Sequence, residues 1–69
     1  MNRASAWAPS SDDLAILGLL AEGHTVASVA RRTGLSERTV RRRLRALGDE
    51  LGVDSTIETV VIAVRAGLI

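Results

Sequence analysis

Cysteine is absent from this chain of 69 residues, as are phenylalanine and tyrosine, and Trp7 is its single aromatic residue. Without cysteine, neither disulfide bonds nor a thiolate zinc site can stabilise the fold. A chain this short buries only about 60% of the surface that it exposes when unfolded, which leaves one modest core and no room for a deep catalytic pocket. Helix packing of Leu, Ile, Val and Ala side chains must therefore hold the fold together.

The chain also lacks a long hydrophobic run. No wholly apolar stretch approaches the roughly 18 residues that a membrane span needs, and the first nine residues have no apolar core typical of a signal peptide. With 46% hydrophobic residues, the composition is nevertheless that of a globular domain. We expect a soluble, cytoplasmic domain with no membrane partner.

Catalytic and metal-binding side chains are equally scarce. His24 is the single histidine, and without a second histidine or any cysteine it cannot form a metal site. We expect it to be a solvent-exposed turn residue. Serine and aspartate cluster where helices are expected to begin, so no nucleophile has an evident base. The sequence predicts neither an enzyme nor a cofactor.

Lysine is absent too, so arginine supplies all nine basic residues, and the net charge is only +1. That balance alone would argue against a nucleic-acid partner, but the charges are segregated. Residues 31 to 45 contain seven arginines against the one acid Glu37, a net charge of +6. Clustered positive charge is what a phosphate-binding surface needs, because it releases counterions from nucleic acid. The arginines of this block are Arg31, Arg32, Arg38, Arg41, Arg42, Arg43 and Arg45.

Start and stop signals predict helices in the first half of the chain. Ser10 can cap a helix over about residues 11 to 22, which Gly23 ends. Thr25 can cap a second, short helix that Gly34 ends. Residues 1 to 9 have no periodic pattern, so we expect a flexible tail or linker there, in which Trp7 is loosely docked or disordered, and a folded domain over residues 10 to 69.

A third helix is predicted over about residues 37 to 51, capped by Ser36 and ended by Gly52. Gly48 within it should weaken its last turns by about 1 kcal/mol. An apolar stripe at helical spacing predicts the face that packs on the core, and it consists of Val40, Leu44, Leu47 and Leu51.

The last segment can be read in two ways. Residues 59 to 64 are apolar and mostly β-branched, which fits a buried strand. Ser55 and Glu58, however, make a full S-x-x-E capping box, and no other segment could pair with a lone strand. We therefore predict a fourth helix, whose inward face consists of Ile57, Val60, Val61, Val64 and Leu68.

The second and third helices, with the turn at residues 33 to 35 between them, predict a helix-turn-helix. At 100° per residue, Arg38, Arg42 and Arg45 lie opposite the apolar stripe, with Arg41 beside them and Arg43 nearer the core. A helix fits the major groove of DNA, where arginine reaches guanine with two parallel hydrogen bonds. We expect base contacts from Arg41, Arg42 and Arg45, and phosphate contacts near the helix starts from Thr25, Ser36, Arg38 and Thr39. The alternative is that this arginine face is merely solvated, as most charge runs are.

The segments LLAEGHT, VASVARRTGLSERTV and LGVDSTIETVVIAVRAGLI resemble the C-terminal DNA-binding domain of LuxR-type and NarL-type bacterial response regulators, a four-helix domain. The resemblance runs from about Ser10 to the C-terminus. It places Arg41 where the family usually has a base-contacting lysine, and Arg42 and Arg45 at its other groove-facing positions. Thr56 departs from the pattern, because an arginine there often contacts phosphate.

The resemblance also implies a homodimer on DNA, because the fourth helix of this family commonly makes the dimer contact. We expect the residues that lie off the predicted inward face to form that contact, since they would otherwise be left exposed. They are Ile62, Ala63, Ala66 and Ile69.

Together these patterns predict sequence-specific binding of double-stranded DNA by the output domain of a nucleoid-associated transcriptional regulator. Two alternatives stay open. The domain could dock on another protein, for example RNA polymerase, through the helix-turn-helix or the fourth helix. It could also be a sigma-like or recombinase DNA-binding module, although the match of the fourth helix argues against that.

Overall fold

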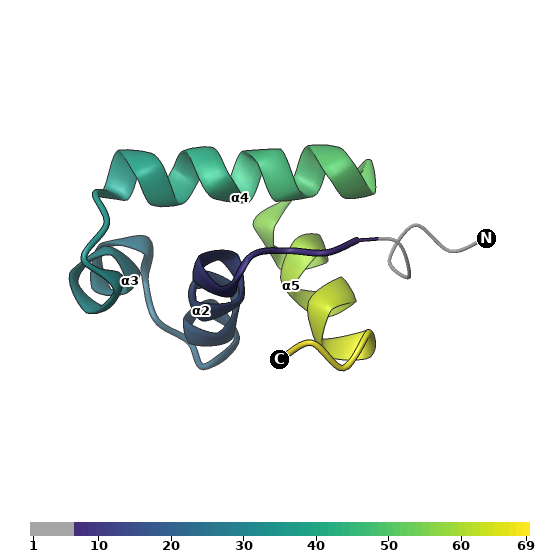
Figure 1. The fold of residues 1–69 in the computed structure, drawn as a ribbon, viewed down its shortest axis with the longest axis horizontal. Helices are drawn as coiled ribbons and strands as arrows, with labels where there is room; N and C mark the ends of the chain where they lie inside the picture. The colour runs from purple at the N-terminus through teal and green to yellow at the C-terminus, as the bar shows by residue number, and fades with distance from the viewer. Residues whose placement is uncertain (1–6) are drawn as a thin grey trace.

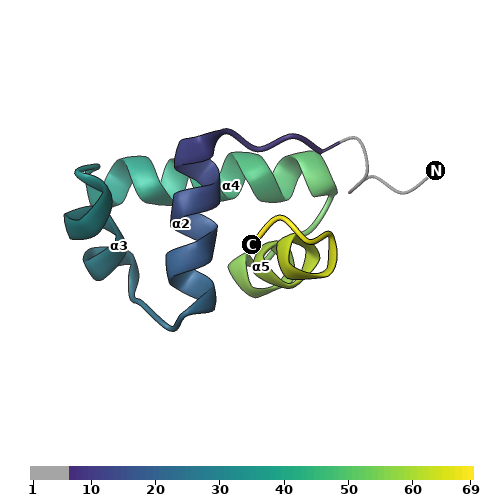
Figure 2. The ribbon, with the colours of Figure 1, turned by 60° about the horizontal axis from the view of Figure 1, so that its bottom comes forward.

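Four α-helices make up residues 7–69, the part of the chain that the computed structural model describes, and no strand occurs there. They are α2 (Ser11–Ala21), α3 (Val26–Thr33), α4 (Glu37–Leu51) and α5 (Thr56–Arg65), labelled in Figure 1. The long helix α4 runs along one side of the molecule, and α2, α3 and α5 all pack against it (Figures 1 and 2). The predicted all-α fold with four helices is confirmed.

Every helix begins at a hydroxyl side chain, as the sequence predicted. The Oγ of Ser10, Ser36 and Ser55 and the Oγ1 of Thr25 each accept a hydrogen bond of 3.1 Å from the backbone N–H three residues on. Each bond satisfies one of the N–H groups that a first helical turn leaves free, and contributes about 1 kcal/mol.

The two capping boxes differ from each other. The box at Ser10 is complete, because Asp13 Oδ2 accepts the Ser10 N–H at 3.1 Å. At Ser55 the predicted full box is wrong in its second half: Glu58 Oε1 accepts the hydroxyl proton of Ser55 at 3.0 Å instead of the backbone N–H. The carboxylate still lies in the first turn of α5, where it interacts favourably with the helix dipole.

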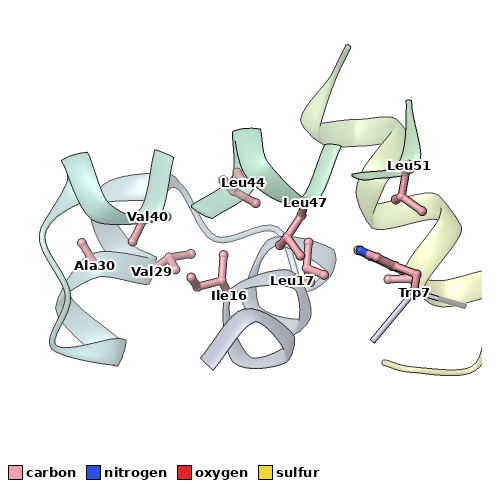
Figure 3. Close-up of a cluster of buried hydrophobic side chains, with 10 residues drawn as sticks. Trp7, Ile16, Leu17, Val29, Ala30, Val40, Leu44, Leu47 and Leu51 are labelled. Atoms are coloured by element: carbon pink, nitrogen blue, oxygen red, sulfur yellow. The ribbon is translucent and has the colours of Figure 1, made fainter. Parts of the chain in front are cut away.

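The core is a cluster of ten buried apolar side chains (Figure 3). The predicted stripe of α4 is buried along its whole length, and each of the other helices contributes one or two side chains. Burial of each Val, Leu or Ile contributes about 1.5–3 kcal/mol. The cluster consists of Trp7, Ile16, Leu17, Val29, Ala30, Val40, Leu44, Leu47, Leu51 and Ala63.

Trp7 belongs to this core, which the sequence did not predict. Its side chain is only 8% exposed and closes the end of the cluster near Leu51 (Figure 3). The expectation of a loosely docked residue is therefore wrong, because a lone aromatic residue outside any repeat gives no periodicity from which docking can be read. The rest of the predicted tail that precedes it, residues 1 to 6, lies outside the described residues.

His24 is more enclosed than predicted. Its side chain is 26% exposed, and Nδ1 lies 3.1 Å from the hydroxyl of Ser28. The hydrogen bond ties the turn after α2 to the first turn of α3, so His24 is a half-buried structural residue and not a solvated one.

The helix α5 packs mostly through a different face from the predicted one, of which only Val60 packs against the core. Thr59 and Ala63 are buried, whereas Ile57 is 73% exposed, and Val61, Val64 and Leu68 are exposed as well. Thr59 lies against α4, where a Cβ added to Gly48 would stand 3.4 Å from Thr59 Oγ1. Val60 and Ile62 are partly buried against the core, whereas Ile57, Val61 and Val64 point outward.

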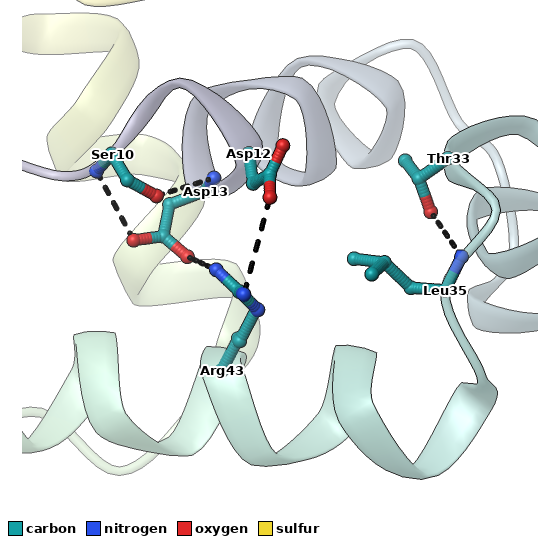
Figure 4. A network of polar contacts seen from close by, with 6 residues as sticks. All are labelled: Ser10, Asp12, Asp13, Thr33, Leu35 and Arg43. Atoms are coloured by element: carbon teal, nitrogen blue, oxygen red, sulfur yellow. Dashed lines mark hydrogen bonds and ion pairs between the residues drawn. The ribbon is translucent and has the colours of Figure 1, made fainter.

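The turn between α3 and α4 has the geometry of a helix-turn-helix. Gly34 ends α3 with a φ of 77°, a conformation that favours glycine. Thr33 Oγ1 donates to the Val29 carbonyl at 2.7 Å and accepts the Leu35 N–H at 3.4 Å, which closes the turn (Figure 4). The predicted helix-turn-helix is therefore present, with α4 as its second helix.

Candidate nucleic-acid interface

The outer side of α4 carries a row of exposed arginines. We define the basic face as Arg38, Arg41, Arg42 and Arg45, all of which are exposed. The opposite side of α4 supplies Val40, Leu44, Leu47 and Leu51 to the core, so the helix is held firmly while its basic face points outward. Within residues 7–69, Arg38, Arg42 and Arg45 have no ion-pair partner, which leaves their N–H groups available to an acidic ligand.

Arg41 differs from the other three because it has an acidic neighbour on its own helix. Its Nη2 lies 3.4 Å from Glu37 Oε1, one turn earlier, and both side chains are about half exposed or more. Exposed pairs of this kind contribute only about 0.3–0.5 kcal/mol, so a ligand can displace Glu37 at small cost. Arg41 therefore remains available, but it is partly oriented before any ligand arrives.

Arg43 does not belong to the basic face. Its side chain is 35% exposed and reaches across to the first turn of α2, where Nη1 lies 3.4 Å from Asp13 Oδ1 and Nη2 lies 3.9 Å from Asp12 Oδ2 (Figure 4). The sequence predicted that Arg43 lies nearer the core, but it gave no signal for these partners, because they lie about thirty residues away in the chain.

Two of the four predicted phosphate ligands, Ser36 and Thr25, are already engaged as helix caps. Ser36 Oγ accepts the Thr39 N–H at 3.1 Å and donates its proton to Thr39 Oγ1 at 3.0 Å. Thr25 Oγ1 accepts the Ser28 N–H at 3.1 Å. Thr39 therefore keeps its own hydroxyl proton for an acceptor, and the first turn of α4 presents it beside the exposed side chain of Arg38.

A groove runs between α4 and the start of α5. Arg41 and Arg45 line it from α4, and Ser55 and Thr56 line it from the start of α5. Asp49 and Asp54 also line this groove, so its far end is acidic. These acids bound the positive surface on the side of the C-terminal half of α4.

Several exposed side chains of α5 are large and apolar, although Glu58 and Arg65 on the same helix are exposed as well. We define the α5 apolar face as Ile57, Val61 and Val64 on α5 together with Leu68, which follows the helix; they are 73%, 41%, 49% and 37% exposed. The structure therefore corrects the predicted dimer contact. Ala63 is 0% exposed and Ile62 packs against the core, and of that predicted set only Ala66 and Ile69 are exposed.

Residues 7–69 offer neither a metal-binding cluster nor a membrane-spanning helix. Their His, Asp and Glu side chains form no group of three that could hold a metal ion. None of their helices is long and apolar enough to cross a membrane.

The homeodomain-like domain family matches residues 14–54, which include nearly all of α2, all of α3 and α4, and the turn between them. This match covers more than half of the chain. The chain belongs to this family. Its homeodomain-like region holds the whole basic face, whereas α5 lies beyond the matched residues.

The chain is also similar to a named regulatory protein. The transcriptional regulatory protein YdfI of Bacillus subtilis (strain 168) is 35% identical over 57 residues, which cover 83% of this chain and 27% of that protein. The chain thus spans about a quarter of the length of the relative that it matches. No solved structure gives a significant match.

The fold brings most of the predicted site residues of the homeodomain-like region together. Ser36, Arg38, Thr39 and the three predicted base-reading arginines lie on one helix, and all but the half-buried Thr39 are exposed. Thr25 stands apart at the start of α3. Sequence reasoning missed two features: the fastening of Arg43 to α2, and the exposure of the α5 apolar face.

Proposed function

We propose that this domain binds double-stranded DNA in a sequence-specific manner as the output domain of a transcriptional regulator, with α4 in the major groove. The observation that carries this proposal is the basic face, a row of four exposed arginines on the second helix of a helix-turn-helix. That helix is the one that enters the major groove in proteins of this architecture. The name of the Bacillus relative, a transcriptional regulatory protein, agrees with it.

The arginines divide into two roles by their place on α4. Arg41, Arg42 and Arg45 are proposed to read base edges, because a guanidinium makes two parallel hydrogen bonds with guanine O6 and N7. Arg38 and Thr39, with the caps Ser36 and Thr25, are proposed to contact phosphates, which fixes the position of the helix without reading sequence.

We further propose that the domain is of the LuxR/NarL type and binds DNA as a homodimer through α5. The α5 apolar face supports this, because four large exposed apolar side chains, three on α5 and one just after it, are costly for a monomer and suit a contact between two copies. This contact replaces the one predicted from the sequence. Ala66 and Ile69 can take part at its edge, but Ala63 cannot.

The same surface favours one alternative, in which α5 docks on another protein such as RNA polymerase while the arginines remain solvated. The two proposals differ in their response to salt. DNA binding must weaken steeply as salt rises, because each neutralised phosphate releases counterions. An apolar protein contact changes little with salt.

The deciding experiment is selection of random duplex DNA by the purified domain at two salt concentrations, with the bound sequences determined. We expect a two-fold symmetric consensus that contains guanines, with stronger binding at low salt. Absence of any enriched sequence at either salt concentration would contradict sequence-specific DNA binding. A consensus that is a single half-site would support DNA binding and contradict the dimer.

A further inference from the structure

The ion pair between α4 and α2 joins a charged residue of the helix-turn-helix to a carboxylate that is mostly shielded from water. Asp13 is 16% exposed, and its two oxygens have different partners: Oδ2 accepts the Ser10 N–H at 3.1 Å, and Oδ1 lies 3.4 Å from Arg43 Nη1 (Figure 4). Asp12 lies on the other side of the guanidinium, at 3.9 Å from Nη2. Two acids therefore neutralise Arg43 in the free protein.

The contact between Arg43 and α2 is directional, unlike the hydrophobic force that buries the apolar stripe of α4. The hydrophobic driving force that buries Leu and Val side chains has no preferred direction, although their close packing restrains α4 as a body. Hydrogen bonds and ion pairs to a guanidinium are directional. The Arg43 contact to the start of α2 therefore adds a directional restraint on the rotation of α4.

A small rotation would matter at the basic face. Side-chain tips lie about 5–6 Å from a helix axis, so a rotation of about 15° displaces them by about 1.5 Å. Paired hydrogen bonds to a base edge hold donor–acceptor distances within a few tenths of an ångström and do not survive such a shift. Contacts to phosphates tolerate it better, because they depend on charge more than on direction.

We propose that Arg43 is a positioning residue: through Asp13 and Asp12 it fixes the rotation of α4 and so aims Arg42 and Arg45 at base edges, without contacting DNA itself. This inference rests on the proposed function. It means that specificity depends on an ion pair between α4 and α2 that lies outside the interface with DNA.

The test compares Arg43→Gln with Asp13→Asn and with the double variant. For each, affinity is measured on the duplex selected by the unaltered domain and on a scrambled duplex of the same length, over a range of salt concentrations. We expect Arg43→Gln to weaken binding to the selected duplex about tenfold, as loss of one paired base contact does, and to leave the scrambled duplex and the salt dependence unchanged. Asp13→Asn should cause the same loss although it makes the protein more positive, and the double variant should lose no more than either single one.

Matched variants separate a positioning role from a change of charge. Arg42→Gln, on the same helix but without an ion-pair partner in residues 7–69, should weaken binding to the selected duplex in every background. Glu22→Gln makes the same change of net charge as Asp13→Asn at the opposite end of α2 and should not weaken binding. Arg43→Lys, which keeps one ion pair, should restore part of the preference for the selected duplex.

Three results would overturn the inference. One is a lower salt dependence in Arg43→Gln, which would make Arg43 a phosphate ligand. Another is tighter binding by Asp13→Asn, which would mean that Asp13 competes with DNA for Arg43. The third is an equal loss on both duplexes, which is the mark of a merely destabilised fold. If the unaltered domain prefers no duplex, the proposed function itself fails, and the positioning role fails with it.

Discussion

Two glycines within helices differ in how much space surrounds them. An added Cβ at Gly18, in α2, would meet no atom within 4 Å, whereas at Gly48, in α4, it would stand 3.2 Å from the Val53 carbonyl oxygen. That carbonyl cannot easily move away, because the Val53 N–H is bonded to the Gly48 carbonyl at 2.9 Å. The same substitution should therefore have opposite effects at the two positions.

We expect Gly18→Ala to stabilise the domain by about 0.5–1 kcal/mol, which is the gain in helix propensity. Gly48→Ala should instead destabilise it by about 1 kcal/mol, because overpacking outweighs the same gain. The free energy of unfolding in urea, followed by circular dichroism, measures both. Equal stabilisation by the two variants would show that α5 and the Val53 loop yield without cost, and that Gly48 only weakens its helix, as the sequence predicted.

The Trp7 side chain stabilises the core through its large apolar ring, but it also buries an N–H group that has no hydrogen-bond partner in residues 7–69. An unsatisfied buried N–H such as this Nε1 group costs about 1–3 kcal/mol. Trp7→Phe removes that cost along with part of the ring, so we expect it to lower stability by less than about 1 kcal/mol. Trp7→Ala should cost about 3–5 kcal/mol, because it leaves a cavity in the core. Thermal unfolding separates the two, and a loss in Trp7→Phe as large as that in Trp7→Ala would show that the N–H has a partner.

At the scale of the element, a feature could be predicted from the sequence when the residues that determine it lie close together in the chain. Helix starts were predictable because Ser or Thr and the N–H that it caps lie three residues apart. The basic face was predictable for the same reason, since its arginines share one helix with the apolar stripe. The face of α5 was not, because residues 60–64 are apolar on every side and the choice depends on packing against α2 and α4, which lie far away in the chain.

That choice of face can be tested with two substitutions of the same kind. Val61 is 41% exposed and Ala63 is 0% exposed, although they lie only two residues apart on α5. We expect Val61→Asp to change stability by no more than about 0.5 kcal/mol, since it introduces a solvated carboxylate. Ala63→Asp should destabilise the domain by several kcal/mol or prevent folding, because the carboxylate would be buried without a partner. Urea unfolding followed by circular dichroism gives both changes in stability. A larger loss in Val61→Asp than in Ala63→Asp would show that α5 packs through the face predicted from the sequence.

At the scale of the whole molecule, the net charge of +1 conceals a separation of charge. Acids lie close to the arginines of α4: Asp12 and Asp13 pair with Arg43, and Asp49 and Asp54 line the groove that Arg41 and Arg45 also line. Electrostatic attraction to DNA should therefore depend on where a charge lies and not on the total. Arg65 offers a control, since it is exposed in the last turn of α5, away from the basic face.

We expect three arginine variants with the same change of net charge to behave differently. Arg38→Ala should weaken binding to selected and scrambled duplexes equally and reduce the slope of log K against log salt by about 0.9, the effect of one lost phosphate contact. Arg42→Ala should cost about 1–3 kcal/mol on the selected duplex through loss of a base contact. Arg65→Ala should leave both affinities and the slope unchanged. If Arg65→Ala lowers the slope as much as Arg38→Ala does, then overall charge attracts the DNA and the basic face has no special part in binding.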